Sequence, residues 1–380
     1  MSLPTPWETA LAEQLSATRR NGRWRERSPR DRRLLDFASN DYLNLARDPR
    51  VAEALGQAAA DLGTGAGAAQ LLGGYQDAHR SLERQLADFV QRPAAALFST
   101  GYMANLGLVG ALTGRGDAVV QDKRNHASLL DGARLSGAQL RRYRHHDLAA
   151  LERQLTRPAR RRLVLVESIY SMDGDLAPLP DIAAIAARHG ALLCVDEAHA
   201  LGVCGPQGAG ALTAFGLGAD EAPVLVGTFG KSLGTFGAFV AGPQAVIDAV
   251  VNHARSQIYT TAPPPALAAA TSCALTLSRE ESWRRERLTQ NIASFHAKLR
   301  SAGLPVPSSS TPIQPMIVGD SETAVHLSRQ LGALHIHAPA VRPPTVREGQ
   351  ARLRITLNAG HDDAAIERLV EGLKASWPNR

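Results

Sequence analysis

Residues 224–234 read VLVGTFGKSLG, a short apolar run followed by a glycine-rich turn that carries Lys231. Lysine is rare in this chain, since arginine supplies almost all of the positive charge; the other lysines are Lys123, Lys298 and Lys374. Arginine stays protonated in proteins, whereas a desolvated lysine can lose its proton and form a Schiff base. The stretch therefore predicts a buried strand that ends in a reactive amine. The alternative is a solvated lysine on an ordinary loop.

Similar apolar runs recur along the chain and alternate with segments of helical character. The predicted strands are 94–98, 118–121, 163–167, 192–196 and 224–227, and the predicted helices include 79–90 and 179–189. Continuous apolar strands that alternate with helices are typical of a parallel sheet covered on both faces. The sequence thus predicts an α/β fold, with ligands bound beyond the carboxyl ends of the strands.

The pattern divides the chain into three parts. Residues 1–50 are predicted to form an N-terminal helix and arm, with a short strand within 35–43. Residues 51–285 contain the alternating pattern and form the predicted large α/β domain. Residues 286–380 form a predicted smaller domain of helices and strands. Its elements are expected near 285–302, 313–318, 351–357 and 363–376.

The composition is that of an ordinary globular protein, with 380 residues, 44% of them hydrophobic and 21% charged. The net charge of +6 would suit a nucleic-acid-binding protein. However, acids or prolines interrupt the arginine-rich stretches 19–33 and 157–162, and no RNA-binding or zinc motif accompanies them. We therefore expect no nucleic-acid partner. The charge indicates a solvated basic surface, or one that steers an acidic partner or an anionic substrate.

The cysteines and the apolar pattern of the chain indicate the cellular compartment. Cys194, Cys204 and Cys273 stand far apart without a CxxC pair, so neither a disulfide framework nor a metal site is predicted. The N-terminus lacks an apolar signal region, and no run of about 18 apolar residues exists. We expect a cytoplasmic protein that has no membrane partner.

Residues 194–199 read CVDEAH, so a predicted strand ends in two acids with a histidine close behind. Beside Lys231, this pattern indicates pyridoxal 5′-phosphate (PLP), which needs a lysine for its aldehyde and a carboxylate against its ring nitrogen. Asp196 is the predicted carboxylate. It would keep the ring nitrogen protonated, so that the ring can accept electrons. His199 is predicted near the ring hydroxyl.

Other groups are predicted to bind the rest of such a cofactor. Gly101 and Tyr102 open a helix after a strand, and free N–H groups at a helix start favour phosphate. Thr228 could add a hydroxyl, and Ser232 is a weaker candidate. His126 could stack on the ring face or could be an ordinary packing histidine. His145 and His146, flanked by arginines, are expected to face solvent.

Two motifs suggest a nucleotide hydrolase instead. Residues 196–199 spell the DEAH box of helicases, and residues 230–232 spell the end of a phosphate-binding loop. That loop requires a glycine where this chain has Leu225. The order of the two motifs is also the reverse of that in helicases. The sequence therefore favours the PLP enzyme.

Taken together, these stretches resemble the α-oxoamine synthases, a family of fold-type I PLP enzymes. The other matching stretches are SNDYL at 39–43, SMDGD at 171–175, TFGK at 228–231 and RLR at 352–354. The resemblance extends from about residue 20 to 375. It implies a large domain with a mostly parallel sheet, a smaller α+β C-terminal domain, and a homodimer whose sites lie at the subunit interface.

The resemblance also implies roles for individual residues. Lys231 would form the Schiff base, Asp196 and His199 would hold the pyridine edge, His126 would cover the ring and Ser171 would approach it. Gly101, Tyr102 and Thr228 match cofactor-binding positions. Thr345 and Arg354 match substrate-binding positions, and Arg354 would bind the amino-acid carboxylate. Arg25 is the chosen arm arginine, with Arg23 and Arg27 as alternatives. Thr260 or Thr261 would serve the partner subunit's phosphate.

Within this family, residues 341–346 (VRPPTV) look most like the biotin-biosynthesis members. Those members condense L-alanine with a pimeloyl thioester, lose CO2 and yield 8-amino-7-oxononanoate. The alternatives are family members that use glycine or serine. Both coenzyme A and acyl carrier protein remain open as the acyl carrier. One departure is Gln70, which stands where many members carry a cationic residue.

Overall fold

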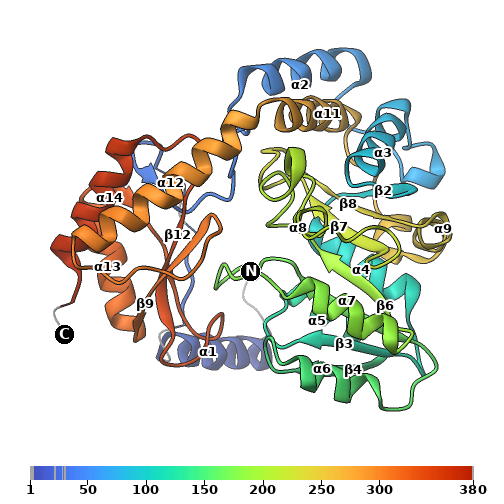
Figure 1. Cartoon of the computed structure of the whole chain (residues 1–380), viewed down its shortest axis with the longest axis horizontal. Helices are drawn as coiled ribbons and strands as arrows, with labels where there is room; N and C mark the ends of the chain where they lie inside the picture. The colour runs from blue at the N-terminus through green and yellow to red at the C-terminus, as the bar shows by residue number, and fades with distance from the viewer. Residues whose placement is uncertain (1–3, 21–22, 28, 30, 379–380) are drawn as a thin grey trace.

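The computed structural model describes residues 4–20, 23–27, 29 and 31–378; the rest of the predicted N-terminal arm lies outside the described residues. Two units are visible, each built around its own sheet (Figure 1). The strands of the larger sheet are β2 (Ala94–Phe98), β3 (Ala118–Asp122), β4 (Gln139–Tyr143), β5 (Arg162–Glu167), β6 (Leu192–Asp196), β7 (Val224–Thr228) and β8 (Ala238–Gly242).

The larger sheet is mostly parallel. Its strand order is β2-β8-β7-β6-β5-β3-β4, and only β8 runs antiparallel to its neighbours. All five strands predicted in this region are present, which confirms the predicted α/β class. The apolar pattern does not predict β4 and β8. The edge strand β4 reads QLRRY, whose charged side chains hide the pattern, and β8 reads AFVAG within a glycine-rich segment.

Helices cover both faces of this sheet, as its strand sequences require. Successive strand residues point to opposite faces. In β5, Leu163 and Leu165 therefore pack into one buried cluster, while Val164 and Val166 pack into the other. The first cluster includes α4 (Gly101–Leu112), α5 (Ala127–Leu135) and α9 (Gln244–His253). The second includes α2 (Pro49–Leu62), α3 (Asp77–Phe89), α6 (Leu148–Leu155), α7 (Leu179–Arg188), α8 (Ala211–Ala214) and α11 (Pro265–Glu280).

The smaller unit contains the antiparallel sheet β11-β12-β9 and three helices. Its elements are α12 (Ser282–Ser301), β9 (Ile313–Gly319), α13 (Ser321–Ala333), β10 (Ile336–His337), β11 (Ala340–Val341), β12 (Ala351–Thr356) and α14 (Asp363–Ser376). The strand β1 (Leu35–Asp36) of the N-terminal arm pairs with β10, so the arm joins this unit. The short connecting elements are η1 (Gln70–Leu72), η2 (Pro206–Gly208) and α10 (Arg255–Ile258).

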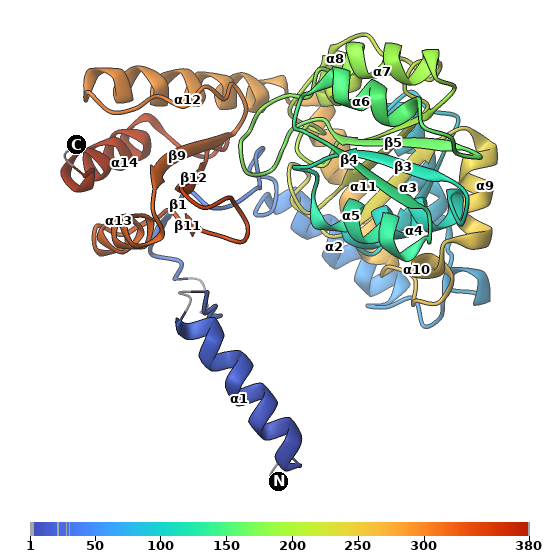
Figure 2. The ribbon, with the colours of Figure 1, turned by 90° about the horizontal axis from the view of Figure 1, so that it is seen from below.

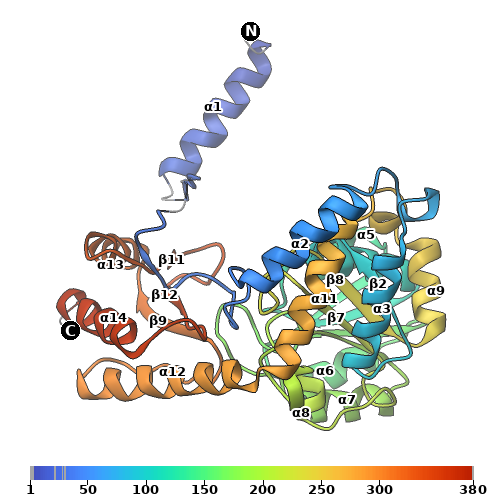
Figure 3. The same ribbon diagram turned by 90° about the horizontal axis from the view of Figure 1, so that it is seen from above.

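The first helix stands apart from the rest. Helix α1 (Thr5–Arg20) has no buried residue and projects away from both units (Figures 2 and 3). None of the described helices is both long enough and apolar enough to cross a membrane.

Candidate active site

A cavity of about 200 Å³ lies where the parallel strands end. Its floor includes the last residues of β5, β6 and β7, because parallel strands bring their carboxyl ends to one edge of the sheet. Seven of the predicted residues line it: Gly101, Tyr102, His126, Asp196, His199, Thr228 and Lys231.

Lys231 is presented by a tight turn between β7 and β8. Phe229 donates its N–H to Gly237 O at 2.9 Å, and Gly234 donates to Lys231 O at 2.9 Å. Gly234 has a φ of 64°, and a Cβ at this position would lie 2.2 Å from Ala46 N. Only glycine fits that backbone and that contact. The glycines of the motif therefore hold the lysine at the cavity.

Burial lowers the pKa of the Lys231 amine to about 8, although the charges of Asp196 and Glu167 act in the opposite direction. A lysine with a pKa near neutrality can exist as the free amine that attacks an aldehyde or removes a proton. This electrostatic setting supports the predicted reactive role.

Asp196 is held by two hydrogen bonds at the end of β6. Asn105 Nδ2 donates to Oδ2 at 2.8 Å, and Ala198 N donates to Oδ1 at 2.9 Å. Asn105, which is 2% exposed, also donates to Ser128 Oγ at 2.9 Å. Sequence reasoning did not assign Asn105, because an asparagine in the apolar helix α4 gives no local signal of a partner 91 residues away.

Glu167 is a second carboxyl group at the cavity, and sequence reasoning assigned it no role. It ends β5 and pairs in register with Asp196, so the two acids are neighbours. Burial and the charge of Asp196 raise the pKa of Glu167 to about 8. The backbone N–H of His126 donates to Glu167 Oε1. Its place at the end of the predicted strand 163–167 already put Glu167 among the groups expected at this edge of the sheet, but no pattern in the sequence pointed to its partner Asp196.

Two histidines border the cavity in different settings. His126 is exposed to the cavity, with Nδ1 2.8 Å from Ser128 Oγ. His199 is 5% exposed, and its Nδ1 lies 2.6 Å from the hydroxyl of Tyr42. Burial lowers the pKa of both imidazoles, so both are neutral near pH 7. The open face of His126 suits stacking on a planar ligand.

The start of α4 forms the end of the cavity that could bind an anion. Thr100 caps this helix by accepting from Met103 N at 3.1 Å, and Gly101 and Tyr102 form its first turn. Thr228 lies beside Gly101, and its hydroxyl donates to Gly237 O at 3.0 Å. Ser232 does not line the cavity: it is 1% exposed and is packed against Gly202.

Arg354 approaches from the smaller unit. It lies on β12, is 7% exposed, and donates from Nε to Ser171 O at 2.7 Å. Its Nη1 donates to Asn40 Oδ1 at 3.1 Å and to Thr356 Oγ1 at 3.0 Å. These bonds orient the guanidinium, and its charge acts on Lys231. Ser171 thus meets Arg354 through its backbone oxygen.

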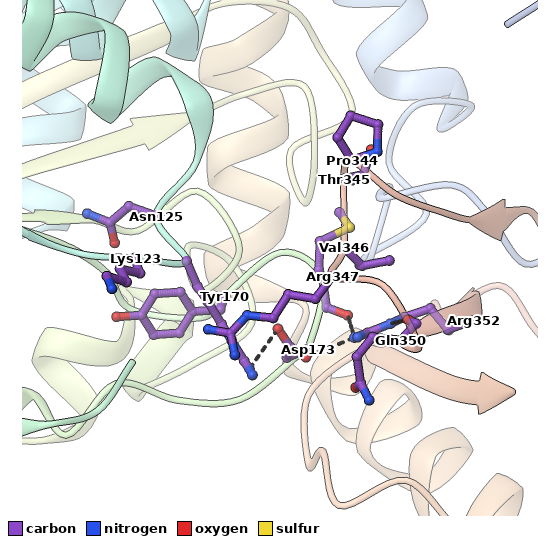
Figure 4. A pocket seen from close by; sticks show the side chains of 12 residues that line it. Lys123, Asn125, Tyr170, Asp173, Pro344, Thr345, Val346, Arg347, Gln350 and Arg352 are labelled. Carbon is purple, nitrogen blue, oxygen red and sulfur yellow. Dashed lines mark hydrogen bonds and ion pairs between the residues drawn. The ribbon is translucent and has the colours of Figure 1, made fainter. Parts of the chain in front are cut away.

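A second cavity, of about 340 Å³, lies between the two units (Figure 4). Thr345 and Arg352 line it from the smaller unit, and Lys123 and Tyr170 from the larger. Arg25 of the arm reaches Thr345, with Nη2 3.4 Å from Oγ1. Arg25 and Thr345 therefore meet each other at this second cavity, apart from Lys231.

Other predictions meet different outcomes. Gln70 donates to Leu97 O at 3.1 Å, so this side chain supports the backbone of β2. Thr260 and Thr261 do not line the cavity of their own chain, and whether they serve a second copy stays a prediction. The expectation that His145 faces solvent is wrong, since its side chain is only 13% exposed, whereas His146 is partly exposed, at 32%. His145 lies between the carboxylates of Asp122 and Asp175. The prediction failed because the sequence does not reveal which acids fold beside this histidine.

The described residues fit PLP. The cavity brings together an amine of lowered pKa, a buried carboxylate, an open imidazole face and a helix start. These four groups match the aldehyde, the ring nitrogen, the ring face and the phosphate of the cofactor. The buried Oδ1 of Asn105 has no hydrogen-bond partner among the described residues, which fits a polar site built around a bound group.

Comparisons with known proteins agree with this chemistry. A family model described as aminotransferase class I and II matches residues 32–373. The chain is 55% identical over 343 residues to an 8-amino-7-oxononanoate synthase of Nitrosococcus oceani, covering 90% of this chain and 91% of the relative. It is 52% identical over 366 residues to the synthase of the same name from Methylococcus capsulatus, covering 94% and 95%.

Solved structures show the same fold. A serine palmitoyltransferase from S. paucimobilis with bound PLP and myriocin is 30% identical, with a TM-score of 0.90 and coverage of 99% of this chain and 98% of that one. An 8-amino-7-oxononanoate synthase from Francisella tularensis is also 30% identical, with a TM-score of 0.80 and coverage of 91% and 98%.

Proposed function

The chain belongs to the 8-amino-7-oxononanoate synthases of the class I and II aminotransferase family, and from this premise we propose how its own residues perform the reaction. It is a PLP-dependent acyltransferase of biotin biosynthesis. The reaction condenses L-alanine with a pimeloyl thioester and yields 8-amino-7-oxononanoate, CO2 and a free thiol. The observation that best supports the residue roles is that Lys231 and Asp196 line one cavity.

Lys231 and Asp196 act at the centre of the reaction. When bound, PLP supplies the electron sink for the charge left at the substrate carbon. Lys231 would hold the cofactor covalently, and its Nζ, when free, would remove the proton from the alanine Cα. The same Nζ later returns a proton to that carbon. Asp196, which Asn105 fixes by a hydrogen bond, would keep the ring nitrogen protonated.

The remaining cavity residues bind and orient. Gly101 and Tyr102 offer backbone N–H groups to the phosphate, and Thr228 offers its hydroxyl after rotation away from Gly237 O. His199, whose Nδ1 lies 2.6 Å from the hydroxyl of Tyr42, would contact the ring edge. His126 would cover the ring face and would polarise the substrate ketone during loss of CO2.

Substrate groups are bound from the other side of the cavity. Arg354 binds the alanine carboxylate, since its guanidinium is already oriented by Ser171 O and Asn40. A fixed carboxylate holds the Cα–H bond in the orientation from which proton loss is easiest. Arg25 and Thr345 contact the acyl thioester, which reaches the site through the second cavity (Figure 4).

The enzyme works as a homodimer in which Thr260 or Thr261 of each subunit completes the phosphate site of the other. Basic side chains at the second cavity, including Lys123 and Arg347, suit an anionic acyl carrier. Both coenzyme A and acyl carrier protein have such charge, so either could deliver the pimeloyl group.

One experiment tests both substrates. The purified enzyme is mixed with L-alanine, glycine or L-serine, each paired with pimeloyl coenzyme A or with pimeloyl acyl carrier protein, and CO2 release is measured. We expect turnover with alanine to exceed that with glycine or serine by at least about tenfold in kcat/KM, as one substrate methyl group can allow. Equal or greater turnover with glycine or serine would assign a different α-oxoamine synthase activity.

A further inference from the structure

His145 lies outside both cavities, in the loop after β4, and is enclosed by two carboxylates. Its Nδ1 lies 3.1 and 3.2 Å from the carboxylate oxygens of Asp122, and its Nε2 lies 2.6 Å from Asp175 Oδ2. Asp122 ends β3 and is 1% exposed. Asp175 belongs to the segment that follows β5. The imidazole therefore joins three segments that are distant in sequence.

Both ring nitrogens can donate to carboxylates only when the imidazole is protonated. Burial alone would lower the pKa of His145, but the hydrogen bonds to Asp122 and Asp175 outweigh it and raise the pKa to about 9. The bridge is thus a charged one at neutral pH. The titratable and charged groups around it are Asp122, Asp175, His146, Tyr170, Tyr143 and Arg124.

The segment held by Asp175 is the one that meets the smaller unit. Each residue from Ser171 to Gly174 offers a hydrogen-bonding group to that unit. Arg352 Nη1 donates to Met172 O at 3.0 Å and to Asp173 Oδ1 at 2.8 Å. Figure 4 shows the side chains of Arg352 and Asp173 facing each other.

The same segment also orients Arg354. Ser171 O accepts from Arg354 Nε at 2.7 Å, four residues before the carboxylate that His145 holds. Gly174 O accepts from the hydroxyls of Ser309 and Thr311 at 2.8 and 3.0 Å. The smaller unit therefore holds one side of the segment, while His145 ties its end to the large sheet.

We propose that His145 is a positioning residue: by bridging Asp122 and Asp175 it sets the place of residues 171–175, and through Ser171 O the place of Arg354. The inference rests on the proposed function, in which Arg354 binds the amino-acid carboxylate. It predicts that removal of the bridge weakens binding of alanine and leaves the cofactor site intact, because no atom of His145 lines the cavity that holds Lys231.

The test compares His145→Gln with His146→Asn. The control residue is adjacent, stacks on His145, and has a φ of 57°, which asparagine tolerates. We expect His145→Gln to raise KM for L-alanine about tenfold, with kcat changed less than about threefold, and with an unaltered absorbance spectrum of bound PLP. His146→Asn should change KM less than about twofold. Asp175→Asn, which removes one carboxylate charge, should reproduce the His145→Gln effect.

The pH dependence separates this role from simple packing. A group whose pKa is raised in the folded state keeps its bridge below that pKa and loses it above, so KM for alanine in the wild type should rise as pH passes about 9. In His145→Gln that component of the pH profile should be absent. Alanine and Lys231 also titrate, but they do so in both enzymes. Comparing the KM profile of His145→Gln with that of the wild type therefore isolates the contribution of His145.

The inference would be overturned by an unchanged KM for alanine in both His145→Gln and Asp175→Asn, or by identical pH profiles of the wild type and His145→Gln. It would also be overturned if Zn²⁺ stabilised the wild type but not His145→Gln, because a metal ion would then take the place of the proton on His145. Failure of the proposed function looks different. In that case Arg354→Gln would leave KM for alanine unchanged, whatever the His145 variants do.

Discussion

At the scale of single residues, the cavity depends on groups whose protonation is set by burial and by neighbouring charges. Lys231 has a lowered pKa, Glu167 a raised one, and Asp196 is held by hydrogen bonds from Asn105 and Ala198. Two acids lie side by side at the strand ends, so a single negative charge is favoured over two.

Lys231→Ala should abolish the reaction, because no other described lysine lines the cavity. We expect CO2 release to fall by on the order of 10³-fold or more, and borohydride treatment to leave no cofactor on the protein. In the wild type, borohydride followed by peptide mapping should place the cofactor on the peptide that contains Lys231. A label on Lys123, Lys298 or Lys374 would refute the assignment.

Asn105→Ala should lower kcat/KM by about 10–100-fold, since it removes a hydrogen bond of about 1.5–3 kcal/mol to the carboxylate of Asp196. The bound cofactor should remain, but with a changed absorbance spectrum. Full activity in this variant would mean that Asp196 needs no help from Asn105. Circular dichroism would establish that the variant is folded.

Glu167→Gln should change the pH dependence of stability. An acid with a raised pKa binds a proton in the folded state that the unfolded chain has lost, so stability falls as pH rises from its ordinary pKa near 4.5 to about 8. The variant lacks this proton, and its Tm in cofactor-free form should decline less between pH 5 and 8. Parallel Tm profiles would show that Glu167 is ionised in the folded protein.

At the scale of elements, the turn between β7 and β8 decides where the lysine lies. Gly234→Ala should lower the free energy of unfolding by at least about 2 kcal/mol, because the new methyl group would meet Ala46 N and the backbone has positive φ. Gly230→Ala is the matched control in the same turn. There a Cβ meets nothing closer than Thr235 O at 3.7 Å. Urea denaturation that gives equal stabilities would contradict the packing argument.

At the scale of the whole molecule, η1 (Gln70–Leu72) and the Thr260–Thr261 segment leave neighbouring apolar groups uncovered. Leu72 is 80% exposed and Tyr259 is 71% exposed, while Ala69 forms a β-bridge with Thr261. Exposed apolar groups gathered in one place indicate an interface. This observation supports a homodimer in which Thr260 or Thr261 reaches the partner's cofactor.

Leu72→Glu should therefore shift the protein from dimer to monomer in sedimentation and weaken PLP binding at the same time. A charge placed in an apolar interface carries a desolvation cost that association must overcome. Leu135→Glu, at the end of α5 with 74% exposure, is the control and should stay dimeric. A monomeric wild type with full activity would refute the shared site.

The sequence by itself determined the parts of this protein that depend on local pattern. Apolar runs located five strands of the large sheet, and the motifs around Asp196 and Lys231 indicated PLP as the cofactor, because strands and turns follow from neighbouring residues. Only the tertiary structure decided which distant groups meet. Examples are Asn105 with Asp196, β1 with β10, and His145 with two acids. Such pairings depend on how strands and loops are placed in space, and the separation of two residues along the chain does not predict whether they meet.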